Sequence, residues 1–272
     1  QLLALLAHDN DPFNRWEAAQ RLGLQHAMQL VAARATSVGA SASFGIENFT
    51  QSPFVAALRS VLRNPELDAA FKELVLTLPS ETYIAEQLDV VDPQAIHAVR
   101  ETMRSALATA LQADWEWAFE AHQNHGGYSP DAVSSGRRAL ANMAQGMLCL
   151  AARGSGDTVW PGKTYQRFKD ANNMTDRFGA LGALLASGHA LATPALEQFY
   201  TLFKDEALVL DKWFSLQAGS TDRGGDILPR VRQLMKHPDF SLKNPNRARS
   251  VVFSYCSGNP GGFHRQDAAG YL

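Results

Sequence analysis

The sequence has 272 residues, of which 46% are hydrophobic and 19% are charged, and its formal net charge is −2. This composition is typical of a globular protein and excludes long disorder. The small net charge excludes the basic footprint of a general nucleic-acid binder. No apolar run approaches the ~20 residues needed to cross a bilayer. We therefore expect neither a nucleic acid nor a membrane as a partner.

The first eleven residues, QLLALLAHDND, have no basic region and no small-residue cleavage site, so they do not resemble a signal peptide. They are typical of the last turns of a helix. The chain has only two cysteines, Cys149 and Cys256. This count excludes a disulfide framework and favours a reducing compartment, so we expect a cytoplasmic location.

Helix starts recur along the chain as a capping residue followed by proline. Proline in the first helical position loses no hydrogen bond, and the preceding side-chain oxygen can accept from the first free amides. Eight prolines follow this rule: Asp11-Pro12, Ser52-Pro53, Asn64-Pro65, Asp92-Pro93, Ser129-Pro130, Thr193-Pro194, Asn244-Pro245 and Asn259-Pro260. Most are followed by apolar residues at spacings of three and four, which indicates amphipathic helices.

The pattern predicts about ten to thirteen helices and no sheet. The expected spans are 12–34, 53–63, 66–77, 81–88, 93–122, 130–153, 161–171, 176–187, 194–204, 206–217, 226–236 and 245–257. Two longer connectors interrupt them. Residues 36–50 are small and polar enough for a flexible surface loop, and residues 154–160 are typical of a glycine-rich turn.

Short connections make sequential helices antiparallel neighbours. No fixed sequence period is visible, so the predicted fold is all-α, an irregular α-solenoid built as a superhelical stack of antiparallel helix pairs. A helix starting near Pro260 would continue beyond Leu272, so we expect the domain to be truncated at its C-terminus. The missing helices would leave an apolar face, which predicts self-association.

The chain offers no catalytic motif. His-Glu-x-x-His, Gly-x-Ser-x-Gly and the glycine-rich phosphate loops are all absent. His122 and His125 form the only close histidine pair, and two ligands are too few for a zinc site. Cys149 lies in an apolar helical run and is expected to be buried. We therefore predict no catalytic residue, metal ligand or cofactor-binding residue in this chain.

Aromatic and basic clusters give weaker signals. Trp115, Trp117 and Phe119 are more typical of packing between helices than of a ligand platform. Arg137-Arg138 and the arginines at 247 and 249 are the better basic sites. Residues two apart on a helix point about 200° away from each other, so only one of Arg247 and Arg249 can face a given cavity. That arginine could bind a peptide carboxylate, or it could be a plain surface residue.

Several segments, in order and over nearly the full chain, resemble the C-terminal helical domain of bacterial aminopeptidase N, a zinc peptidase of the gluzincin class. The segments are AHDNDPFNRWEAAQRL at 7–22, LTLPSE at 76–81, DPQAIHAVRETM at 92–103, DANNMTDRFGAL at 170–181, ALVLDKWFSLQA at 207–218, NPNRARS at 244–250 and NPGGFHRQDAAGY at 259–271. The family usually has Asp-Gly-x-Gly-Tyr near this end, whereas Ala268 here replaces the first glycine.

The resemblance implies that residues 1–272 are the C-terminal α-helical domain of an aminopeptidase N without its final helices. In that family the zinc site and the Gly-x-Met-Glu-Asn sequence belong to the catalytic domain, which would be this chain's partner. The helical domain encloses the active-site cavity and limits access for the peptide substrate. The resemblance also implies that Arg249 contacts the peptide. The domain alone should be inactive, with zinc present only in the parent enzyme.

The same helix pattern fits a second interpretation, a free-standing α-solenoid scaffold that binds a protein partner along its concave face. An upstream reading frame containing His-Glu-x-x-His and Gly-x-Met-Glu-Asn would favour the peptidase, and a start codon before Gln1 would favour the scaffold.

Overall fold

The computed structural model describes residues 1–36 and 42–271, and these residues form helices with no strand among them. The predicted all-α fold is confirmed. The α-helices of this part are α1 (Leu2–His8), α2 (Pro12–Thr36), α3 (Ala42–Thr50), α4 (Pro53–Arg63), α5 (Ala69–Leu76), α6 (Glu81–Ala85), α7 (Pro93–Ala110), α8 (Gln112–Ala121), α9 (Ala132–Ser155), α10 (Val159–Asp170), α11 (Met174–Ser187), α12 (Ala192–Phe203), α13 (Ala207–Ala218), α14 (Ile227–Leu234), α15 (Pro245–Ala248), α16 (Ser254–Gly258) and α17 (Pro260–Phe263). A π-helical turn, η1 (Arg249–Phe253), joins α15 to α16, and a 3-10 turn, η2 (Ala269–Tyr271), follows α17.

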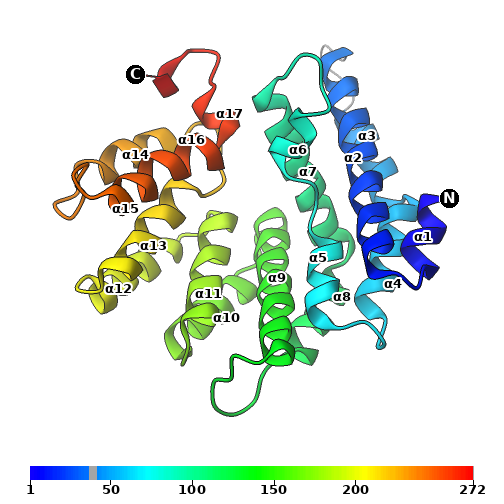
Figure 1. Ribbon diagram of the computed structural model, residues 1–272, viewed down its shortest axis with the longest axis horizontal. Helices are drawn as coiled ribbons and strands as arrows, with labels where there is room; N and C mark the ends of the chain where they lie inside the picture. Colours follow the sequence, from blue (N-terminus) through cyan, green and yellow to red (C-terminus); the bar gives the residue numbers. More distant parts are fainter. Residues whose placement is uncertain (37–41, 272) are drawn as a thin grey trace.

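Helix α9 runs through the middle of the molecule and contacts α5, α7, α8, α10 and α11. The N-terminal helices lie on one side of it and α12–α17 lie on the other (Figure 1). The described residues form two hydrophobic clusters, one drawn from Leu6 to Trp160 and the other from Phe168 to Tyr255. The helices therefore follow an arc, and α17 at its far end contacts α7.

Capping side chains start several helices as the sequence predicts. The oxygens of Ser52, Asp92 and Asn244 accept from the first free amides of α4, α7 and α15, each with proline in the first turn. At the other end, α9 and α11 stop at Gly156 and Gly188, whose φ angles of 73° and 70° suit glycine. Local sequence thus sets these boundaries.

Two predicted connectors are shorter than expected. The sequence predicts a loop over residues 42–50, but they form α3, because Phe49 is buried against His26 and Phe54 and supplies the helix with a core contact. The rest of that connector, 37–41, lies outside the described residues. In the second connector, α9 continues to Ser155 and α10 begins at Val159, so the glycine-rich turn spans only the residues between them.

Other predicted helices are divided in the structure. The single helix expected over 93–122 breaks at Leu111, which has φ −112° and ψ 22° and is fully buried, giving α7 and α8. The described residues hold 17 α-helices, more than predicted. The helix starting at Pro260 does not run on toward Leu272 but ends at Phe263. The side chain of Asn259 makes no capping bond to it; its Nδ2 donates to the carbonyl of Ala218.

A close helix crossing fixes α5 against α9. A Cβ built on Gly136 of α9 would lie 2.9 Å from the backbone nitrogen of Ala70 and 3.1 Å from its Cβ. Backbone cannot move aside as a flexible side chain can, so the hydrogen atom of glycine is required here. Gly146, ten residues further along α9, has nothing within 4 Å of a built Cβ.

We predict that Gly136→Ala destabilises the protein by about 1–3 kcal/mol through overpacking. Gly146→Ala is the matched control in the same helix. It should be neutral or stabilising by up to ~1 kcal/mol, because alanine has the higher helix propensity. Urea denaturation of both variants measures the difference. Equal effects would contradict the close approach of α5 and α9.

Candidate functional site

The described residues line two adjoining cavities on the inner side of the arc, of about 630 Å³ and about 370 Å³. Both volumes fall in the range of ligand pockets. The first cavity has apolar walls from α11, α13 and η1, including Phe178, Leu216 and Phe253. Its polar side chains, apart from Arg104, are the hydroxyls of Ser215, Ser220, Thr221, Ser254 and Ser257. The second cavity lies between α5, α7, α9 and α11.

Three residues line both cavities: Arg104, Gly182 and Ala186. Arg104 projects from α7 and donates from Nη1 to both carboxylate oxygens of Glu101, at 2.9 and 3.2 Å. Since the two residues are three apart on one helix, they are surface neighbours by helix geometry. Arg104 is therefore the one charged side chain common to the two cavity walls.

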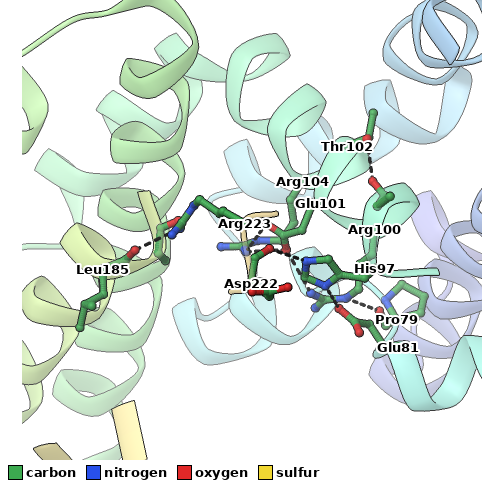
Figure 2. A network of polar contacts seen from close by, with 12 residues as sticks. Pro79, Glu81, His97, Arg100, Glu101, Thr102, Arg104, Leu185, Asp222 and Arg223 are labelled. Carbon is green, nitrogen blue, oxygen red and sulfur yellow. Dashed lines mark hydrogen bonds and ion pairs between the residues drawn. The ribbon is translucent and has the colours of Figure 1, made fainter. Parts of the chain in front are cut away.

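Two further arginines lie near Arg104 (Figure 2). Arg100 lines the second cavity, donates from Nε to the carbonyl of Pro79 at 2.8 Å, and has its pKa lowered by burial and by the neighbouring charge of Arg104. Arg223 donates from Nη2 to the carbonyls of Leu185 and Ala186 at the end of α11. The helix dipole stabilises a cation placed at the C-terminus of a helix. Arg223 thus secures the end of α11 beside the first cavity.

His97 of α7 joins the N-terminal half of the arc to its C-terminal helices. Its Nδ1 lies 2.7 Å from Oε1 of Glu81, and its Nε2 lies 2.9 Å from the carbonyl oxygen of Asp222 (Figure 2). On the same side, a Cβ built on Gly261 of α17 would lie 3.0 Å from Cβ of His97. The segment before α14 and helix α17 therefore both meet α7 at this histidine.

Both ring nitrogens of His97 face oxygen acceptors, and only the imidazolium can donate from both. The hydrogen bond with Glu81 raises the pKa of His97 to about 9, against the opposing effect of burial. His97 therefore carries a positive charge at neutral pH. A smaller cavity of about 280 Å³ lies beside it, with Asp222, Gly225 and Arg265 in its wall.

The structure distinguishes the roles of Arg247 and Arg249, which the sequence could not. Arg247 is 6% exposed; its Nε donates to Asp211 Oδ1 at 2.5 Å and its guanidinium lies 5.0 Å from the ring centre of Phe214. It also donates to the carbonyl of Asp239. Arg249 is exposed on η1, one turn before Phe253 and Ser254, which line the first cavity. Arg249 itself lines neither cavity, and its role in substrate binding stays a prediction.

The other basic and aromatic signals have structural roles. Arg137 donates to the carbonyls of Ala121 and Gln123 where α8 ends, and Arg138 is buried and donates to the carbonyl of Ser129. Trp115 is fully buried, as a packing role requires.

His122 has its pKa lowered, mainly by burial, and its Nδ1 lies 2.8 Å from the carbonyl oxygen of Ala118. Among the described residues no group of three or more His, Cys, Asp or Glu side chains could hold a metal ion. The residues present therefore do not fit zinc, and a zinc ion of a parent enzyme would need ligands from outside this chain.

Sequence reasoning missed the contacts that join distant helices. Glu81 and His97 are 16 residues apart, and His97 and Asp222 are 125 residues apart, so no local spacing reveals either pair. Only the pair of Glu101 and Arg104 has a spacing that a helix pattern could have identified. Over residues 1–36 and 42–271, no helix is long and apolar enough to cross a membrane.

The class of protein follows from the helical arc and from a match over its whole length. Residues 1–272 match the family described as a domain of unknown function (DUF3458_C) with ARM repeats, and the chain belongs to this family. ARM repeats are stacked helices, which agrees with the α-solenoid predicted from the sequence.

The relatives place this domain in aminopeptidases. Aminopeptidase N of Caulobacter vibrioides is 38% identical over 98% of this chain, and aminopeptidase N of Escherichia coli K12 is 33% identical over all of it. A crystal structure of Legionella pneumophila aminopeptidase A in complex with aspartic acid matches 99% of the chain with a TM-score of 0.80 and 27% identity. The chain spans 29%, 30% and 30% of the lengths of these proteins. The predicted resemblance to the C-terminal helical domain of bacterial aminopeptidase N is confirmed.

We predict that His97 makes stability fall as pH rises. Its folded-state pKa of about 9 lies above the unfolded value of 6.5. Its contribution is therefore complete below pH 6.5, falls as pH rises and is lost once pH passes about 9. The difference amounts to on the order of 3 kcal/mol. Urea denaturation from pH 6 to 10 measures it, with His97→Gln as the control that removes the titrating group. Parallel pH profiles for the two proteins would contradict the charged state of His97.

Proposed function

We propose that this chain is the non-catalytic helical domain of a zinc-dependent aminopeptidase, which encloses the active-site cavity of the parent enzyme and limits the access of peptides to it. The parent removes N-terminal amino acids from peptides. The catalytic domain of the same enzyme is the partner of this chain, and the zinc ion is held there. A cytoplasmic location is part of the proposal and rests on the free thiols of Cys149 and Cys256.

The observation that supports the proposal most directly is the pair of adjoining cavities on the inner side of the arc. Their walls combine apolar side chains, hydroxyl groups and a cation, which is the mixture that an extended peptide with variable side chains requires. About 70% of the length of these relatives lies outside the region that matches this chain, which leaves room for a separate catalytic domain.

Arg249 is proposed to contact the bound peptide on its C-terminal side. The side chain is exposed on η1, and among the described residues it makes no hydrogen bond or ion pair that would hold it away from a ligand. Its neighbours one turn further on, Phe253 and Ser254, line the larger cavity. A peptide leaving that cavity along η1 would pass this guanidinium.

The proposal predicts that the isolated chain, supplied with zinc, does not turn over aminoacyl anilides, whereas the full-length protein does. The reason is that metal-activated water needs ligands that the described residues do not bring together. Release of the aniline, followed by absorbance with and without a chelator, measures both. Chelator-sensitive turnover by the isolated chain would overturn the division of roles, and an inactive full-length protein would favour the scaffold interpretation.

A second prediction contrasts the two arginines in the full-length protein. Arg249→Gln should raise the KM for tetrapeptides on the order of tenfold, the loss expected for one charge-assisted hydrogen bond. Arg247→Gln should instead lower stability by about 3 kcal/mol, because it leaves the half-buried carboxylate of Asp211 without its partner. Steady-state kinetics and thermal melting separate the effects. An Arg249 variant with the wild-type KM would remove this residue from the binding surface.

A further inference from the structure

The residue that links the two cavities is a cation with unused donors. Arg104 lines both cavities and bonds Glu101 through Nη1 alone. A guanidinium has five N–H donors in a fixed plane. The described structure gives no hydrogen bond from Nε or Nη2 of Arg104, and the side chain is 21% exposed. These groups remain available to a ligand that enters either cavity.

The charges near Arg104 leave the site positive. Arg100 lies close enough for its charge and that of Arg104 to oppose each other, and Arg104 has the same effect on Arg223. Glu101 is the carboxylate in direct contact with this group, at 2.9 Å from Arg104 and 3.8 Å from Arg100. Arg100 and Arg104 therefore share one bonded anion, and Arg223, whose charge Asp226 partly balances, adds a third cation nearby. A concave surface with low-dielectric walls strengthens the positive potential that such a charge imbalance produces.

One carboxylate in the cavity walls, that of Glu73, offsets part of this charge in the second cavity. Glu73 lines the second cavity from α5, and burial raises its pKa. The first cavity has no carboxylate in its wall, since its polar lining residues other than Arg104 are serines and a threonine. An anion approaching from the first cavity therefore competes for Arg104 only with the carboxylate of Glu101, which is bonded to Nη1.

The cavity wall beside Arg104 has room for a ligand. Gly182 and Ala186, one turn apart on α11, face both cavities together with Arg104. A Cβ built on Gly182 would meet nothing closer than 3.7 Å. Small residues on the facing helix leave space for a planar group to approach the guanidinium, and carboxylates bind arginine through two parallel hydrogen bonds.

From these observations we infer that Arg104 binds a carboxylate of the peptide, at the junction of the two cavities and supported by the positive charges of Arg100 and Arg223. The inference rests on the proposed function, because it takes the ligand to be a peptide held by the parent enzyme. The carboxylate is either the C-terminus of a short peptide or an acidic side chain of a longer one. Arg104 is thus a specificity residue that favours peptides with a negative charge beyond the cleaved bond.

The test compares matched substrates in the full-length protein and in its Arg104→Gln variant. One pair is Ala-Ala-Ala and its C-terminal amide, and the other is Ala-Ala-Glu-amide and Ala-Ala-Gln-amide. We expect wild type to favour the charged member of one pair about tenfold in kcat/KM, through KM. Arg104→Gln should bring this ratio close to one. The pair that responds identifies the source of the carboxylate.

Two further variants keep the test decisive. Arg104→Lys retains the charge but loses the two-pronged geometry, so it should keep part of the preference. It replaces the glutamine variant if thermal melting shows that the latter does not fold. Arg21→Gln is the matched control, because Arg21 is also paired within its helix, to Glu17 of α2, and lines neither cavity. It should keep the wild-type ratio.

The possible failures differ from one another. A full-length protein that hydrolyses none of the four peptides would overturn the proposed function. Turnover without any preference for a charged peptide, or a preference that Arg104→Gln keeps in full, would overturn the carboxylate site alone.

Discussion

The imidazolium of His97 is the contact on which the shape of the inner surface depends. It joins Glu81 and the carbonyl of Asp222, and so holds α7 against a segment more than a hundred residues later in the chain. The larger cavity has Arg104 of α7 on one wall and α13 and α16 on the other. A neutral ring would leave one nitrogen facing an oxygen acceptor without a proton, at a cost of about 1–3 kcal/mol. The charge of one histidine therefore contributes to holding the two walls together.

Further contacts reinforce this closure. Asn259 is 2% exposed and donates to the carbonyl of Ala218, and the hydroxyl of Tyr255 donates to the carbonyl of Gly262. Both bonds tie the short helix α17 to the helices that precede it. Gly261 then approaches His97 so closely that a methyl group would already be tight. Side-chain hydrogen bonds to the backbone, and a glycine without a Cβ, thus hold α17 in place. A helix of four residues could not be held by packing alone.

Much of this fold could be predicted from the sequence, because proline and capping residues act locally. Ser52, Asp92 and Asn244 mark helix starts that the structure confirms. The sequence predictions were wrong where tertiary contacts outweigh local preference. Residues predicted as a polar connector form a helix in which Phe49 is buried, and the helix predicted as continuous breaks at the buried Leu111. The candidate site was less accessible to sequence reasoning. Its members come from α7, α11 and the segment before α14, and only packing brings them together.

Four arginines of this chain show what decides whether a cation stabilises the fold or binds a ligand. Arg247 and Arg138 are buried and spend their donors on an aspartate and on carbonyls, so a ligand could reach them only by displacing those bonds. Arg249 and Arg104 stay accessible at the border and at the junction of the cavities. Charge is equal in all four. What differs is the number of acceptors that the fold supplies, and an arginine with fewer acceptors than donors keeps its capacity to bind an anion. In a domain without a metal-ligand cluster among its described residues, this difference in bonding separates the cations that are open to a ligand on the inner surface from those that hold the fold together.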